Sequence, residues 1–125
     1  MKTYIDLVSA AKPQVRLIAT NEAELALAQA DVVIDVREES EYADGHLPGA
    51  LHMSRGVIEG RLSANPDYLR PDLRIVLYCR TDARASLAAV SLQSMGYTHV
   101  QVLMGGFDAW STSGKPLMKP YLRQS

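Results

Sequence analysis

The single cysteine of the chain, Cys79, is followed closely by two arginines, Arg80 and Arg84. A thiolate is a strong nucleophile, and a nearby guanidinium group or helix N-terminus can lower the pKa of a thiol from about 8.5 by one to several units. Free cysteine is also among the most buried residue types, so a lone cysteine is often only a core residue. On these residues alone, Cys79 is either a catalytic nucleophile or a packing residue.

The segments that flank Cys79 predict a strand before it and a helix after it. Residues 74–79 (RIVLYC) form an apolar run, whereas residues 84–97 (RASLAAVSLQSMGY) are alanine-rich and helix-periodic, with Gly96 as a C-terminal cap. Cys79 would therefore lie at the carboxyl end of a strand, where open α/β sheets place their ligands. The N–H groups and positive dipole of the following helix can hold an anion there, which favours a thiolate.

Strand-like and helix-like segments alternate along the rest of the chain. Apolar, β-branched runs at 31–36 and 99–104 predict two more buried strands, and residues 16–19 predict a short one. Helices are expected at residues 4–11, 20–29, 57–62 and 107–111, the second of them capped by Thr20 or Asn21. Residues 53–72 are otherwise expected to form a long surface connection, and the tail after residue 111 to be irregular. This order of elements indicates a parallel α/β sheet.

The bulk properties indicate one globular domain and exclude several kinds of partner. A chain of 125 residues with a net charge of −1 is long enough for one core, and it has no basic patch for nucleic acid or acidic membranes. One cysteine and three histidines offer neither an internal disulfide nor a metal cluster, which indicates a reducing compartment. Because the N-terminal residues resemble neither a signal peptide nor a membrane span, we expect a cytoplasmic protein without a metal or other cofactor.

Three motifs follow one another along the chain: VIDVREESEYADGHLPGALHM at 33–53, YCRTDARAS at 78–86, and VLMGGFDAW at 102–110, with GKPL after the last. Together they resemble the signatures of the rhodanese-like domain, the sulfurtransferase superfamily. The resemblance implies an α/β fold with a five-stranded, mostly parallel sheet and helices on both faces. It also implies one domain over residues 1–125, with a core at 17–117 and an accessory N-terminal helix within residues 1–16.

The resemblance implies that Cys79 carries sulfur. Its thiolate would attack the outer sulfur of thiosulfate or a persulfide and become a cysteine persulfide, whose sulfur a thiol or cyanide would then accept. The partners would be these small donors and acceptors, or a protein that supplies or receives the sulfur. The loop that binds the substrate would contain Arg80, Thr81, Asp82, Ala83, Arg84 and Ala85, with backbone N–H groups directed at the sulfur.

Other classes of function stand beside this enzyme. A carrier that passes on a partner's sulfur with little turnover on small donors would use the same cysteine, whereas an inactive regulatory domain would not need it. Related phosphatases have a loop one residue longer between their cysteine and arginine, which leaves room for phosphate. Four residues separate Cys79 from Arg84, which occupies the loop-closing position of the family, so the spacing favours sulfur transfer.

Asp82 departs from the family pattern, which commonly has glycine at this position. We expect its backbone to make a tight turn that aspartate tolerates, and its carboxylate to point outward and pair with Arg80 or Arg84. A carboxylate that faced the sulfur would oppose a thiolate and repel thiosulfate, so Asp82→Gly is expected to raise thiosulfate turnover.

The remaining motif residues have structural interpretations. The resemblance makes Asp35 and Arg37 residues that organise the loop, with Glu41 as a candidate partner of Arg37. The others are His46 in its turn, His52 and His99 at strand ends or on the surface, and Phe107 and Trp110 packed beside the site.

Overall fold

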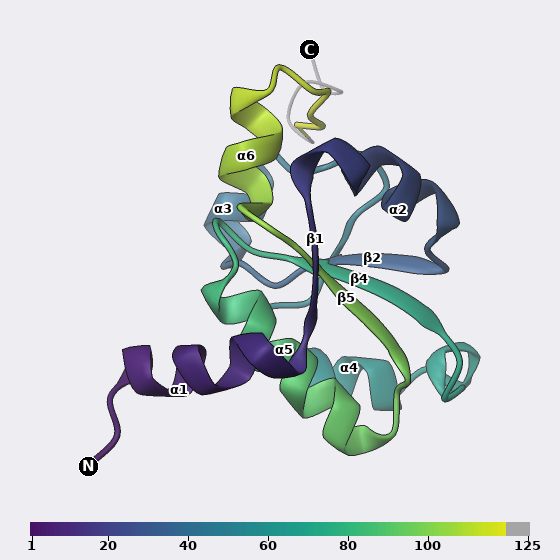
Figure 1. The fold of residues 1–125 in the computed structure, drawn as a ribbon. Helices are drawn as coiled ribbons and strands as arrows, with labels where there is room; N and C mark the ends of the chain where they lie inside the picture. Colours follow the sequence, from purple (N-terminus) through teal and green to yellow (C-terminus); the bar gives the residue numbers. More distant parts are fainter. Residues whose placement is uncertain (120–125) are drawn as a thin grey trace.

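The computed structural model of the chain describes residues 1–119; the last part of the tail, residues 120–125, lies outside this description. Its centre is a five-stranded sheet in the order β1-β5-β4-β2-β3, in which every neighbouring pair is parallel (Figure 1). The strands are β1 (Arg16–Ile18), β2 (Val32–Asp35), β3 (Leu51–His52), β4 (Arg74–Tyr78) and β5 (His99–Leu103). The expected five-stranded α/β sheet is confirmed, and it is parallel throughout rather than mostly parallel.

Helices cover both faces of this sheet (Figure 1). They are α1 (Tyr4–Ala11), α2 (Ala23–Gln29), α3 (Glu39–Asp44), α4 (Ile58–Ser63), α5 (Ala83–Met95) and α6 (Gly106–Thr112). Successive side chains of a strand point to opposite faces, so Leu77 of β4 packs in the core with α4 and α5, whereas Val76 packs in the core with α2 and α6. The central strand β4 is therefore enclosed on both sides, and it carries Cys79 directly after its last residue.

Helix α1 projects from the body of the molecule, with the N-terminus at its free end (Figure 1). Thr3 caps it: the Thr3 hydroxyl accepts a hydrogen bond from the N–H of Asp6, and the Asp6 carboxylate accepts one from the N–H of Thr3. The buried residues of α1 are Val8 and Ala11, and the helix contacts α5. Its second half therefore attaches it to the molecule and brings Lys12, the next residue, close to α5. Neither α1 nor any other helix within residues 1–119 is long and apolar enough to cross a membrane.

Several short elements differ from the sequence prediction. The helix expected over residues 20–29 starts as a 3-10 turn at Thr20–Glu22, so the prediction that Thr20 or Asn21 caps α2 is wrong. Helix α3 and strand β3 have no counterpart in the prediction, because six and two residues are too few to show a hydrophobic period. The described tail after α6, residues 113–119, contains no helix or strand, as expected, and one isolated antiparallel bridge joins its Met118 to His46.

Candidate active site

Cys79 begins a short loop that leads from β4 into α5. Its side chain is buried, and its Sγ accepts a hydrogen bond from the N–H of Ala85 over 3.4 Å. The backbone N–H groups of Arg84 and Thr81 also lie close enough to lower the pKa of the thiol. The N–H of Ala85 is thus directed at the sulfur, and those of Arg84 and Thr81 favour its anion.

The pKa of the Cys79 thiol is nevertheless raised above its ordinary value. Burial is the largest cause, because a thiolate loses its hydration in the core, and the N–H of Ala85 and the charge of Arg84 oppose it. The helix end and the arginines alone predict a lowered pKa, and that prediction is wrong in direction because the sulfur is fully enclosed. The anion therefore depends on the contacts made inside the loop.

Arg84 is held by Glu41 of α3. Its Nη1 and Nη2 atoms donate to the two carboxylate oxygens of Glu41 at 2.8 and 3.2 Å, a bidentate arrangement that fixes the guanidinium plane. The hydrogen bond from Arg84 is the main cause that lowers the pKa of Glu41 to about 2. The expected Glu41–Arg37 pair is therefore wrong, because α3 brings Glu41 to the active-site loop instead.

Asp35 and Arg37 form a buried ion pair at the end of β2. The Nη2 and Nε atoms of Arg37 donate to the Asp35 carboxylate at 2.8 and 3.1 Å. Nη2 also donates to the carbonyl oxygen of Gly45 at 2.6 Å, and the guanidinium lies 4.1 Å from the centre of the Phe107 ring. Arg37 thereby joins β2 to the turn after α3 and to α6, which is an arrangement suited to organising the loop.

The carboxylate of Asp82 pairs with a residue that the sequence does not place in the site. Its partner is Lys12, with 2.9 Å between Nζ and Oδ1, whereas Arg80 pairs with Asp108 at 3.2 Å. The predicted pairing of Asp82 with Arg80 or Arg84 is wrong, because other elements supply carboxylates to both arginines. The backbone of Asp82 has a φ of −143°, so this position does not require the conformational freedom of glycine.

Helix α6 closes the loop from the other side. The N–H of Phe107 donates to the carbonyl oxygen of Cys79 at 2.8 Å, and the N–H of Asp108 donates to that of Arg80 at 3.0 Å. A Cβ at Gly106 would collide with the carbonyl oxygens of Cys79 and Thr81. The glycine therefore allows the first turn of α6 to hold the backbone of the active-site loop.

Other aromatic and imidazole residues lie around the loop or in the core. The ring of His46 stacks on Tyr42 at 3.7 Å, and the Nε2 atom of His52 lies 2.8 Å from the carbonyl oxygen of Arg37. Trp110 is buried in the core on the α2 and α6 face. Phe107 thus contacts the site through Arg37, whereas Trp110 has a core position.

A depression of about 390 Å³ lies beside the loop, which contributes Arg80 to its wall. The charged residues that line it are Arg37, Arg80, Lys119, Glu41, Asp44 and Asp108. Because cations and carboxylates are equal in number, the depression has no strong net charge. In the described part of the chain, no group of His, Cys, Asp and Glu side chains is arranged to hold a metal ion.

The site is a buried cysteine at the end of the central strand of a parallel α/β sheet, with a backbone N–H directed at its sulfur. The protein is thus an α/β protein with one enclosed cysteine as its candidate nucleophile. Residues 19–113 match the Rhodanese-like domain family. The chain belongs to this family, and its relatives place it in the sulfurtransferase class.

The chain is similar to a protein called a sulfurtransferase from Allochromatium vinosum, with 36% identity over 89 residues that cover 71% of this chain and 79% of the relative. It is also similar in structure to the polysulfide-sulfur transferase homodimer of Wolinella succinogenes. Their TM-score is 0.74 at 32% identity, covering 90% of this chain and 84% of that one. A third similar structure is that of a protein from Rhodopseudomonas palustris, described as of unknown function and a possible tyrosine phosphatase. The TM-score is 0.81 at 28% identity, and the match covers 94% of this chain and 96% of that one.

Proposed function

We propose that the protein moves a sulfane sulfur from thiosulfate or a persulfide to a thiol or cyanide through a persulfide on Cys79. The observation that carries this proposal is the buried sulfur of Cys79, which accepts the N–H of Ala85 at the carboxyl end of β4. A loop of backbone donors can hold the negative charge of a thiolate or persulfide without reorganising during the reaction. The names of the relatives from A. vinosum and W. succinogenes support the transfer of sulfur.

The proposed reaction has two displacement steps. In the first, the Cys79 thiolate forms an S–S bond with the outer sulfur of the donor, while the donor's own bond to that sulfur breaks. The electron pair of the broken bond leaves with sulfite or with a thiolate. In the second step, the acceptor forms a bond to the outer sulfur of the persulfide, and Cys79 leaves as a thiolate. In each step the attacking group supplies the electron pair of the new bond, and the leaving group keeps the pair of the broken bond. No external oxidant or reductant is therefore consumed.

The residues of the loop have distinct roles in this mechanism. The N–H of Ala85 stabilises the sulfur anion, and Arg84, held in place by Glu41, adds positive charge beside it. Arg80 lines the depression beside the loop, and its positive charge would attract an anionic donor to the site. The N–H of Thr81 also favours the sulfur anion, Asp82 and Ala83 shape the backbone, and the buried Asp35–Arg37 pair supports the loop from β2.

We further propose that residues 17–117 form the catalytic core of one domain and that residues 1–16 are an accessory segment. The nucleophile has to stay reduced in order to accept sulfur, and a single cysteine without a disulfide partner suits a reducing compartment such as the cytoplasm.

A phosphatase is the second candidate, because the structural neighbour from R. palustris is described as a possible tyrosine phosphatase. The short spacing between Cys79 and Arg84 argues against it. Both terminal nitrogens of Arg84 are also engaged by Glu41, so they are not free to clamp a phosphate. A sulfur carrier with little turnover on small donors would form the same persulfide, and only its rate would differ.

Mass spectrometry of the intact protein tests the proposal. After treatment with thiosulfate or an organic persulfide, a mass increase of about 32 Da, that of one sulfur atom, is expected on Cys79 and is expected to disappear when a thiol is added. Cys79→Ser is the control and should show no adduct. The absence of an adduct from both donors would exclude the enzyme and the carrier alike. Hydrolysis of p-nitrophenyl phosphate by the wild type but not by Cys79→Ser would favour the phosphatase. An adduct with slow thiocyanate formation would indicate a carrier.

A further inference from the structure

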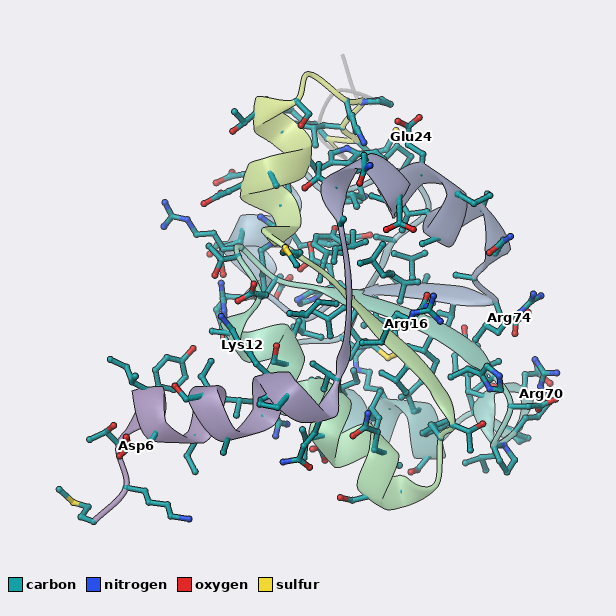
Figure 2. All side chains as sticks on the ribbon, in the orientation of Figure 1. Asp6, Lys12, Arg16, Glu24, Arg70 and Arg74 are labelled. Atoms are coloured by element: carbon teal, nitrogen blue, oxygen red, sulfur yellow. The ribbon has the colours of Figure 1, made fainter. Side chains whose placement is uncertain are left out.

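An ion pair connects the N-terminal segment to the active-site loop. Lys12 is the residue at which α1 ends, and its Nζ lies 2.9 Å from Oδ1 of Asp82 in the loop between Cys79 and α5. The side chain of Lys12 is 42% exposed, whereas that of Asp82 is 17% exposed. Figure 2 shows Lys12 at the end of α1 that meets the body of the molecule. Residues far apart in the sequence thus meet in the loop that begins at the nucleophile.

Asp82 lies in the same loop as Cys79, so the direction and charge of its carboxylate can affect the thiol. Asp82 is the residue at which α5 begins, and its carbonyl oxygen accepts the N–H of Ser86 at 2.9 Å. Its side chain does not cap the helix, so the carboxylate is directed to Lys12 and not to the N–H groups around the sulfur. A carboxylate without its own cation, in the same loop as Cys79, would disfavour the thiolate and any anionic substrate.

Within residues 1–119 the neighbouring arginines are already paired. Arg84 is bound by Glu41, and Arg80 by Asp108. Both terminal nitrogens of Arg84 are on Glu41, and Arg80 is directed to Asp108 through its Nε, so neither guanidinium contacts Asp82 in this structure. Lys12 is therefore the cation that neutralises Asp82 in the described part of the chain.

The attachment of α1 does not depend on this ion pair. Val8 and Ala11 are buried, and the Nε2 atom of Gln93 on α5 donates to the carbonyl oxygen of Gln14 at 3.0 Å. Removal of the ammonium group of Lys12 should therefore leave α1 in place. A change in the reactivity of Cys79 would then result from the lost charge of Lys12 and not from the detachment of α1.

We propose that Lys12 is a positioning residue for the reaction at Cys79: by pairing with Asp82 it holds this carboxylate away from the sulfur and cancels its charge. Helix α1 thereby sets how well the site accepts anionic reagents and donors. The extension to sulfur donors rests on the proposed function, whereas the effect on the thiol itself does not. The charge that acts directly on the thiol is that of Arg84. The other charged and titratable groups of the loop and of the elements packed against it are Lys12 and Tyr4 from the N-terminal segment, Asp35, Arg37 and Glu41 from β2 and α3, Arg80 and Asp82 from the loop, and Asp108 from α6.

Alkylation of Cys79 in the full-length chain tests this role without a sulfur donor. Iodoacetamide is neutral and iodoacetate is anionic, so their rates as a function of pH separate the amount of thiolate from the electrostatic potential at the site. In Lys12→Met we expect the pKa of the thiol to rise by about 0.5 to 1 unit, so that below this pKa the rate with iodoacetamide falls about three- to tenfold. The rate with iodoacetate should fall further. Lys12→Arg should restore most of both rates.

Asp82→Asn provides the reciprocal variant. On its own it should raise both rates, and in the double variant Lys12→Met, Asp82→Asn it should return the rates and the pH profile to near those of the wild type, because no uncompensated charge remains. Lys2→Met is the matched control, since it removes the same charge from an exposed residue of the same segment and should change nothing.

Two results would overturn the proposal. One is a Lys12→Met protein, folded by circular dichroism, with the pH profile and the iodoacetate to iodoacetamide ratio of the wild type. The other is a slower Lys12→Met that Asp82→Asn does not rescue, since the effect would then come from structure and not from charge. A protein that shows the expected alkylation pattern but forms no persulfide would contradict the proposed function and leave the role of Lys12 standing.

Discussion

At the scale of single residues, the surroundings of Cys79 combine burial with balanced charge. The sulfur is enclosed, which raises the pKa of the thiol, and backbone donors such as the N–H of Ala85 supply the opposing stabilisation. The charged side chains nearby are paired: Arg84 with Glu41, Arg80 with Asp108, and Asp82 with Lys12. The ion pairs therefore hold elements in place around the nucleophile rather than create a strong net potential. Two single residues in this region yield predictions about stability.

The Glu41–Arg84 pair predicts how the stability changes in acid. In the folded protein the pKa of Glu41 is about 2, below its ordinary value of 4.5, chiefly because of the hydrogen bond from Arg84. The folded carboxyl group binds a proton less readily than the unfolded one, so its contribution is complete above pH 4.5 and is lost as the pH falls toward 2. Glu41→Gln should lower the free energy of unfolding at pH 7 by about 1 kcal/mol. Measured by urea denaturation between these pH values, the free energy of unfolding should fall less steeply with decreasing pH in Glu41→Gln than in the wild type. Equal slopes for the two proteins would contradict the low pKa of Glu41.

Ser86 predicts a gain in stability. Its side chain is fully buried in α5, and among the described residues its hydroxyl oxygen has no hydrogen-bond partner. Ser86→Ala removes an unsatisfied polar group, so we expect the free energy of unfolding in urea to rise by about 1 kcal/mol. Ser91 on the same helix is the control, because its hydroxyl donates to Glu59 at 2.7 Å and Ser91→Ala should not stabilise the protein. Loss of stability in Ser86→Ala would show that this hydroxyl has a partner.

At the scale of the elements, the site could be predicted only in part. The strand β4 and the helix α5 are long enough to show their periods, and Gly96 ends α5 with a φ of 109°, as its position in the sequence indicates. They place Cys79 and its loop. The ion-pair partners could not be predicted, because Glu41 depends on the short helix α3 and Lys12 depends on the packing of α1 against α5. The burial that raises the pKa of the thiol is likewise a property of the packed molecule.

The first turn of α6 yields a prediction that separates backbone strain from collision. Gly106 and Gly114 both have positive φ, 50° and 75°, but a Cβ at Gly106 would meet the carbonyl oxygens of Cys79 and Thr81, whereas one at Gly114 would meet nothing within 4 Å. Gly114→Ala should therefore cost about 1 kcal/mol of stability, and Gly106→Ala about 3 kcal/mol or more. Urea denaturation measures both, and equal losses would mean that the loop moves to accommodate the methyl group. Gly106→Ala should also expose Cys79 to faster alkylation by a neutral reagent.

At the scale of the whole molecule, the parallel sheet determines where all these parts meet. The carboxyl end of β4 lies at the centre of the sheet, so α3 and α6 reach it from the strands on either side, and α5 continues from it directly. Helix α1 comes before the first strand and adds to this arrangement through α5 and Lys12. The site thus lies at the carboxyl end of the central strand, and the projecting helix α1 (Figure 1) is joined to its loop by the Lys12–Asp82 ion pair.

Removal of residues 1–14 tests whether this helix is an addition to a core that folds without it. The strands and the other helices keep their contacts with one another in such a chain, while α5 and β1 lose those with residues 1–14. The buried side chains that are lost, Val8 and Ala11, contribute about 2–3 kcal/mol together. We therefore expect a shortened protein that still unfolds cooperatively in urea, at a lower midpoint. It also lacks Lys12, so Cys79 should show the slower alkylation and the higher pKa expected of Lys12→Met. A chain without cooperative unfolding would make residues 1–14 part of the core, whereas a stable chain with the wild-type pH profile would show that α1 has no effect on the nucleophile.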